Sequence, residues 1–256
     1  MSEPSPGYLL KLDRGVSHRD SLDEAVKRWL KRERCSAALE TDPQTGEHVL
    51  RVYVAEQPPI ELSLLVGDCV HNMRAALDHI VYQLASNFIE SLSDSQAKSV
   101  EFPIFSDADR FAQRGLTRLK YIAPAARSLI EEMQPYNGGD WEHLSLLHDL
   151  DRIDKHRQLN LSVAASEGFE FDCGKEGRPE MRVLNPPGGP IEGYADLVRF
   201  RCVPKVGSKG EMKPNASATF QVALSDGPPA WSVVDQLCEI DSLIRDKVIP
   251  PLVPFL

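Results

Sequence analysis

The segment from Gly67 to Leu84 reads GDCVHNMRAALDHIVYQL and predicts a strongly amphipathic helix. Its apolar side chains, with those just outside it, recur at spacings of three and four, which places them on one stripe of an α-helix. We expect this stripe to be core: Val66, Val70, Met73, Leu77, Ile80, Val81, Leu84 and Phe88. The flank beside it is unusually polar and holds Asp68, His71, Asn72, Arg74, Asp78 and His79. Such a flank indicates either a functional site or a structural hydrogen-bonded network.

The composition limits the class of the protein and its partners. The chain has 256 residues, of which 42% are hydrophobic, and this is enough for a large core. A formal charge of -9 argues against a protein that coats nucleic acid or an anionic membrane through bulk electrostatics. A local basic site remains compatible with this charge.

Cysteine usage and the N-terminal residues predict the compartment. The five cysteines are widely spaced and include no CxxC pair, so neither a disulfide framework nor a cysteine zinc site is indicated. We therefore expect reduced cysteines in a cytoplasmic protein. The first residues, MSEPSPGYLLKLDRG, lack a basic region followed by an apolar run, and about eighteen consecutive apolar residues occur nowhere. Secretion and membrane spanning are therefore not expected.

The first part of the chain, residues 1–158, is predicted to be rich in helices. Ser21 is expected to cap a short helix with Leu22, Val26 and Trp29 on its apolar face. Alternating apolar and polar residues on both sides of DPQTG predict a β-hairpin. The remaining elements expected here are helices at 60–88, 125–133 and about 140–158, with an apolar tether, FPIF, at 102–105, where a proline disfavours a central strand.

The pattern changes after residue 158 to short β-rich runs separated by glycine and proline. These runs predict an antiparallel sheet of about five strands within 159–226, followed by a closing helix at 231–248 that ends at Pro250. Because helices and strands occur in separate runs, the predicted fold class is α+β rather than alternating βαβ units. We expect a single domain over 1–256, in which the N-terminal hairpin and helical bundle pack with the C-terminal sheet and the closing helix returns to the helices.

Arg74 and His79 form an R-x4-H arrangement in the sequence RAALDH. Residues five apart on an α-helix are separated by about 140° and about 7.5 Å along the axis, so the two side chains flank a face without touching. They could converge only on something that lies across the helix. Ala75 and Ala76 remove bulk between them, so a phosphate, another helix or a symmetry-related copy could approach closely.

This R-x4-H pattern on a helix resembles the signature of HEPN-type proteins, helical bundles that include metal-independent ribonucleases. The resemblance implies that Arg74 stabilises a phosphate and that His79 acts as general acid or base, with Asn72 and Asp78 orienting them. An imidazole suits proton transfer because its unperturbed pKa lies near neutrality. The same resemblance implies RNA or another phosphate-containing ligand as partner and a homodimer as the working form, with no cofactor.

A second motif, LDRIDKHR, lies on the helix predicted at about 140–158. Together with HNMRAALDH it resembles paired motifs in uncharacterised bacterial and phage-borne proteins, which implies that the two helices work as a pair. We therefore expect a carboxylate of the second helix within salt-bridge distance of Arg74. The binding residues predicted on the two helices are His71, Asp151, Asp154, His156 and Arg157.

Two further interpretations of these residues remain open. In the first, Arg74, Asp78 and the DKHR residues form a buried clamp that fixes helix register, and the protein is a non-catalytic scaffold or a small-ligand-binding protein. In the second, histidines and carboxylates of both helices hold a metal for hydrolysis. No HExxH or ExxH spacing supports a metal, and GxxxxGK[ST], GxGxxG and GxSxG do not occur.

Overall fold

The computed structural model describes residues 5–175, 177–184, 189–207, 212, 214–225 and 231–256. It contains helices and antiparallel sheets, so the predicted α+β class is confirmed. The chain divides into two compact units. The helical unit comprises the residues up to Leu22, Leu64–Leu159 and Val234–Leu256, and the sheet unit comprises Asp23–Ser63 and Asn160–Val233.

Helix α1, Gly7–Leu30, is much longer than the helix predicted to start at Ser21. The reason is that apolar residues upstream of Ser21 extend the buried face, since Tyr8 and Leu12 are buried as well as Leu22. Gly15 does not interrupt the helix. A side chain there would meet Met73 Cγ at 3.5 Å and the Cys69 carbonyl at 3.6 Å, so this glycine allows α1 to approach α2 closely.

Helix α2, Ile60–Phe88, has the bounds that the sequence predicts. Its apolar stripe is buried from Val66 to Leu84, so the expectation that the stripe is core is confirmed there, while Phe88 at its end is exposed. Gly67 lies inside the helix without ending it. A Cβ atom at this position would lie only 2.6 Å from the carboxyl carbon of Asp154, because Asp154 of α7 (Glu142–His156) packs onto the bare backbone.

The segment between α2 and α7 consists of short helical pieces around an extended tether. The FPIF residues form neither helix nor strand, as predicted, and Phe102 is completely buried. The pieces are α3 Asp94–Ala97, α4 Ala108–Arg110, a π-helical turn Phe111–Gly115, α5 Leu116–Arg118, α6 Pro124–Glu132 and 3-10 turns at Pro135–Asn137 and Gly139–Trp141.

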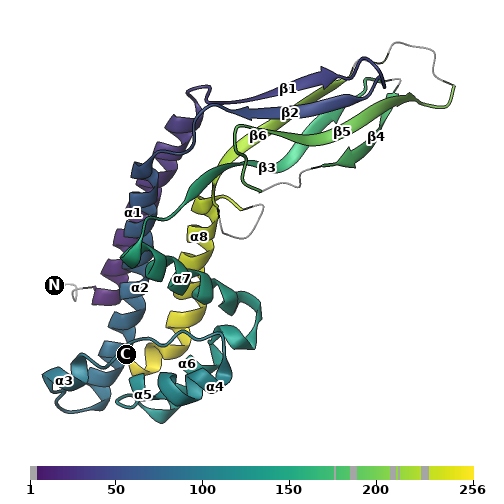
Figure 1. The fold of residues 1–256 in the computed structure, drawn as a ribbon. Coiled ribbons are helices and arrows are strands. Elements are labelled where there is room, and N and C mark those ends of the chain that lie inside the picture. Colours follow the sequence, from purple (N-terminus) through teal and green to yellow (C-terminus); the bar gives the residue numbers. More distant parts are fainter. Residues whose placement is uncertain (1–4, 176, 185–188, 208–211, 213, 226–230) are drawn as a thin grey trace. The chain divides into compact units, whose positions relative to one another are not determined.

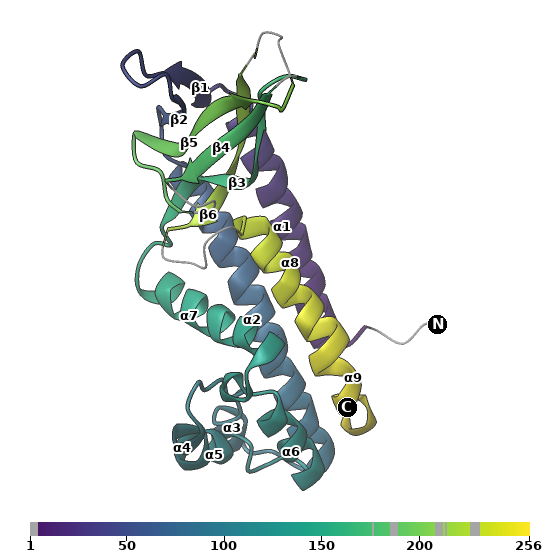
Figure 2. The same ribbon diagram turned by 90° about the vertical axis from the view of Figure 1, so that its right-hand side faces the viewer.

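The closing helix belongs to the helical unit, which confirms its predicted return. It comprises α8 Val233–Leu243, a π-helical turn Ile244–Val248, α9 Ile249–Leu252 and a 3-10 turn Val253–Phe255. Arg245 joins it to α1 by an ion pair to Asp13 at 2.9 Å. The predicted end at Pro250 is wrong, because the prolines lie in the first turn of α9, where a backbone N–H is not needed. Figure 1 and Figure 2 show α1, α2 and α8 running side by side within this unit.

The sheet unit contains two antiparallel sheets. The strands are β1 Cys35–Thr41, β2 His48–Val54, β3 Leu161–Asp172, β4 Gly177–Val183, β5 Tyr194–Pro204 and β6 Asn215–Leu224. The hairpin β1–β2 is confirmed, and it joins β5 and β4 in the order β1-β2-β5-β4, while β3 pairs with β6. The predicted single sheet of about five strands is not found, because two predicted strands merge into β3 across a register shift and the hairpin supplies two strands to the larger sheet.

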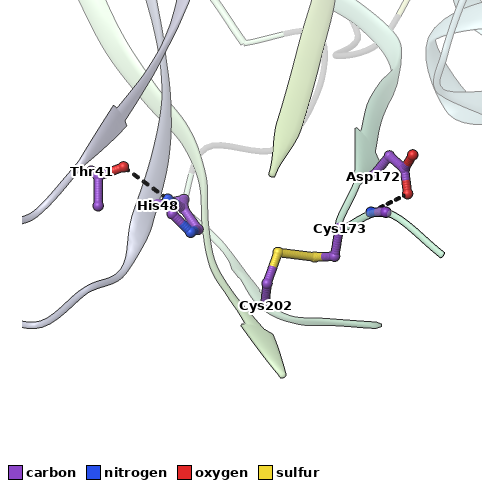
Figure 3. The surroundings of a disulfide bond; sticks show 6 residues. Thr41, His48, Asp172, Cys173 and Cys202 are labelled. Carbon is purple, nitrogen blue, oxygen red and sulfur yellow. Dashed lines mark hydrogen bonds between the residues drawn. A yellow bond between two sulfur atoms is a disulfide. The ribbon is translucent and has the colours of Figure 1, made fainter. Parts of the chain in front are cut away.

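The two faces of the larger sheet differ in polarity. Leu50, Val52, Val198 and Phe200 are buried on one face, which we name the inner face. Cys202 of β5 follows the same alternation, and its sulfur is bonded to Cys173, which lies just after β3 (Figure 3). The inner face is therefore the one that β3 approaches, and side chains that alternate with these point away from it.

The disulfide between Cys173 and Cys202 corrects the expectation that all cysteines are reduced. The two α-carbons lie 5.6 Å apart, which is within the usual range for a disulfide. The sequence could not indicate this pairing, because only the folded arrangement of β3 and β5 brings the residues together. Such bonds persist mainly in oxidising compartments, so the predicted cytoplasmic location stays a prediction without support from the cysteines. Within the described residues, no helix is both long and apolar enough to cross a bilayer.

Replacing Cys173 and Cys202 together with serine is expected to lower the free energy of unfolding by about 2–4 kcal/mol, because the bond closes a loop across a sequence separation of 29 residues. Urea denaturation with and without dithiothreitol measures the effect. The reductant should destabilise the natural protein to the same degree and leave the double variant unchanged. Equal stability of both proteins in oxidising buffer would contradict the bond.

Candidate functional site

Arg74 is buried inside the helical unit and held by three acceptors. Its side chain is only 5% exposed. The Nη2 atom donates to the Phe102 carbonyl at 2.7 Å and to Glu101 Oε1 at 3.0 Å, and it lies 3.1 Å from Asp78 Oδ1. The predicted pair between Arg74 and Asp78 is therefore confirmed, and the guanidinium is turned into the protein rather than toward solvent.

Asp78 binds the same residue as Arg74, but through the backbone amide of that residue. Its Oδ1 accepts a hydrogen bond from the Phe102 backbone N–H at 2.9 Å. Arg74 and Asp78 therefore bind the carbonyl and the amide of one residue, and they fix the FPIF tether against α2. We call Arg74, Asp78, Glu101 and the Phe102 backbone the clamp. Arg118 extends it with an ion pair to Glu101 at 2.9 Å.

Burial changes the acidity of two groups at the clamp. Burial raises the pKa of Asp78, and the Arg74 charge and the Phe102 N–H oppose this shift. Burial and the Arg74 charge both lower the pKa of His148 on α7, which favours its neutral form. Within the described part of the chain, Arg74 Nη1 and His148 Nδ1 are buried without hydrogen-bond partners. The Nη2 side of the guanidinium is therefore hydrogen-bonded, whereas the Nη1 side is not.

The expectation that a carboxylate of α7 lies within salt-bridge distance of Arg74 is wrong. The carboxylate partners of Arg74 are Asp78 and Glu101, and Asp151 of α7 is paired with Lys155 at 2.6 Å instead. The reason is that Glu101 and the Phe102 carbonyl at the start of the tether occupy the space that α7 was expected to fill. Helix α7 still influences the clamp, because the Lys155 charge opposes the rise in the pKa of Asp78.

His79 lies on a different side of α2 from Arg74, at a cavity of about 610 Å³. The imidazole is exposed, and the N-terminal residue of α1, Gly7, lies so close that a side chain there would meet His79 Nδ1 at 3.0 Å. The residues lining this cavity, which we call the His79 cavity, are Gly7, Tyr8, Asp78, His79, Tyr82, Gln83, Ser86 and Val100. Only Asp78 belongs to both the clamp and the cavity.

Asn72 does not reach either place. It is buried, and its Nδ2 donates to the Asp68 carbonyl one turn earlier in α2 at 2.8 Å. Its amide thus satisfies the backbone of its own helix, a common arrangement for asparagine on a helix. The predicted role of Asn72 in orienting Arg74 and His79 has no support in these contacts.

Asp154 lies at the crossing of α7 and α2, where it packs on Gly67. Burial raises its pKa, the nearby carboxylates Asp151 and Asp68 add to this, and His71 opposes it. His71 and Asp151 therefore lie near enough to Asp154 to affect its charge, and the binding role of the three residues stays a prediction. His156 and Arg157 are exposed at the end of α7.

The structure offers no metal centre in its described part, where no three histidine, cysteine, aspartate or glutamate side chains are placed to share an ion. Comparison of the chain with family models, with curated proteins and with solved structures gave no match. The interpretation of the site therefore depends on its own geometry.

Several residues of the site were not singled out from the sequence. Glu101 and the Phe102 backbone were missed because they lie at the start of a short tether whose sequence does not indicate its partner. Tyr8 and Tyr82 line the His79 cavity from α1 and α2. A usable signal existed for Tyr82, which lies three positions after His79 and one turn after Asp78, on the polar flank of the helix.

Replacing Arg74 with methionine is expected to lower the free energy of unfolding by about 1–3 kcal/mol, because the buried Phe102 carbonyl loses its donor, while Asp78 is 36% exposed and can still be hydrated. Arg152→Met is the matched control. The Arg152 side chain is 65% exposed and pairs with Asp149 on the same helix, so its loss should cost about 0–1 kcal/mol. Urea denaturation compares the two variants, and similar small losses would show that the clamp does not hold the tether.

Replacing Asp154 with asparagine is expected to raise the melting temperature at pH 7. Folding raises the pKa of this carboxyl above its unfolded value of about 3.9, so its contribution to stability is present below that pH and is lost as the pH rises through the folded pKa. The advantage of the variant should therefore disappear as the pH falls below about 4. Asp149→Asn, which breaks a surface pair with Arg152, should not raise the melting temperature, and an equal rise in both variants would contradict this account.

Proposed function

We propose that this chain is a small-ligand-binding protein and that the His79 cavity is its binding site. The observation that carries the proposal is the separation of Arg74 from His79. The arginine is sealed inside the clamp, whereas the histidine borders an open cavity of about 610 Å³, a size typical of small-molecule sites. The clamp is then structural, and it holds Asp78 at the cavity wall.

The lining indicates the chemistry of the ligand. Tyr8, Tyr82 and Val100 supply carbon surface, which favours an aromatic or aliphatic body. Asp78 supplies a carboxylate, with the imidazole of His79 beside it. A carboxylate only accepts hydrogen bonds when ionised, so the ligand should carry an N–H or O–H donor at one end. An amine or alcohol with an aromatic body meets these requirements.

A metal-independent ribonuclease receives less support from this geometry. That activity requires Arg74 at the scissile phosphate, but its guanidinium faces a carbonyl and two carboxylates. A phosphate that entered this space would meet Asp78 and Glu101, whose charges repel it. RNA cleavage, a phosphate-containing ligand at this site, the HEPN-type relationship, a homodimer and a cytoplasmic location remain predictions.

Ligand-observed NMR with 2-phenylethylamine, 2-phenylethanol and phenylacetate tests the proposed function. The three probes share one aromatic body, and we expect saturable binding of the amine and the alcohol. The carboxylate should bind at least tenfold more weakly, because Asp78 repels it. Tyr82→Ala should weaken binding of the amine by about tenfold through loss of the aromatic wall.

A matched pair of histidine variants provides the control. His79→Ala changes the lining, whereas His71→Ala removes an exposed histidine of the same helix that does not line the cavity. Only the first should alter probe binding. Lack of saturable binding by the amine and the alcohol, or equal effects of the two variants, would overturn the proposal. RNA cleavage that is lost in His79→Ala at unchanged melting temperature would instead establish the ribonuclease.

A further inference from the structure

The larger sheet has a second face, opposite the inner face, which we call the outer face. On β5, Phe200 and Cys202 point inward, so Arg199 and Arg201 alternate to the outer face. The pairing of β4 with β5 places Arg182 opposite Arg199 and Glu180 opposite Arg201. On the other side of β5, Tyr53 of β2 lies opposite Tyr194, and a register shift between Leu50 and Arg51 places this tyrosine pair on the same face as Arg199. The outer face therefore carries arginines at one end and tyrosines at the other.

The arginines of the outer face are only partly neutralised by carboxylates. Arg182 and Arg199 are directly opposite each other on neighbouring strands, and like charges in such positions are destabilising. Arg199 and Arg201 share a single carboxylate, Glu47, at 3.7 and 3.6 Å. Arg182 is exposed and has no ion pair among the described residues. Glu180, which lies opposite Arg201, pairs with Arg178 at 3.4 Å. Arg182 beside Arg199 is therefore the position on this face that a bound anion would stabilise.

The tyrosines of the same face are exposed and fixed in position. Tyr53 is 38% exposed and Tyr194 is 63% exposed, and their ring centroids lie 6.4 Å apart. The Arg51 guanidinium lies 5.5 Å from the centroid of the Tyr194 ring and is itself held by Asp196 at 2.5 Å. The Tyr53 hydroxyl donates to Glu40 at 2.5 Å. These contacts hold two aromatic rings at the surface of the sheet.

We propose that the outer face binds single-stranded nucleic acid. Cations that track a phosphate backbone, together with aromatic rings on which unpaired bases stack, are the two components of such sites. Tyr194 and Arg199 lie five residues apart on β5, roughly 15 Å along a strand, so bases and phosphates of one strand reach both. A duplex would keep its bases stacked and away from the rings. The charge of -9 on the whole chain disfavours binding of the polyanion elsewhere.

Fluorescence anisotropy of the full chain with fluorescein-labelled 12-nucleotide RNA and DNA strands tests this inference. The double variant Arg182→Gln, Arg199→Gln should weaken binding of the strands by tenfold or more. The slope of log K against log salt should become shallower by about 1.4, since each phosphate that an arginine neutralises on a single strand contributes about 0.7 to the slope. Tyr194→Ala should weaken binding by about tenfold through loss of base stacking.

Arg152→Gln provides the control, because it removes an exposed arginine from the helical unit and should leave affinity within twofold of the natural protein. Circular dichroism melting checks that each variant folds. Weaker binding of a duplex of the same sequence and of heparin supports the inference, and preference for RNA over DNA adds recognition of the 2′-hydroxyl. The inference is overturned if the natural protein does not bind strands at 50 mM salt, if heparin and duplex bind equally well, or if the two sheet variants match the control.

Discussion

The buried guanidinium of Arg74 is the interaction on which the arrangement of the helical unit depends. A cation removed from water costs several kcal/mol unless carboxylates and hydrogen bonds replace its hydration. Asp78, Glu101 and the Phe102 carbonyl are those replacements. Because Phe102 belongs to the tether and Glu101 directly precedes it, these contacts with Arg74 also fix the tether on α2. The tether in turn buries Phe102, which couples this polar contact to the packing of the core.

Elements set by local periodicity could be predicted from the sequence. Helix α2 and the β1–β2 hairpin follow from spacing and turn residues within short segments. Pairings between distant segments could not, and they include β2 with β5, β3 with β6 and Cys173 with Cys202. An alternating strand shows which of its faces is apolar, but it does not indicate which strand lies beside it. The extent of α1 was missed because the helix is much less hydrophobic than α2.

The same difference between local and distant contacts applies to the candidate site. The sequence placed Arg74 and His79 about 140° apart on one helix, and the structure keeps that separation. Whether something lay across the helix to join them depended on a tether and on α1, and neither could be placed from sequence. In the structure Arg74 binds the tether, and the start of α1 lies against His79. Asp78 belongs to both the clamp and the His79 cavity, so the clamp contacts fix the position of its carboxyl in the cavity wall.

Acidic and basic side chains gather in different parts of this acidic chain, and its net charge does not show this. Asp68, Asp151 and Asp154 gather where α7 crosses α2, and burial together with the charges of the other two carboxylates raises the pKa of Asp154. Arginines gather instead on the outer face, where strand register rather than sequence proximity brings Arg182 beside Arg199. Net charge therefore constrains binding by the whole surface, while a local site depends on which residues the fold aligns. For this reason a formal charge of -9 is compatible with an anion-binding face.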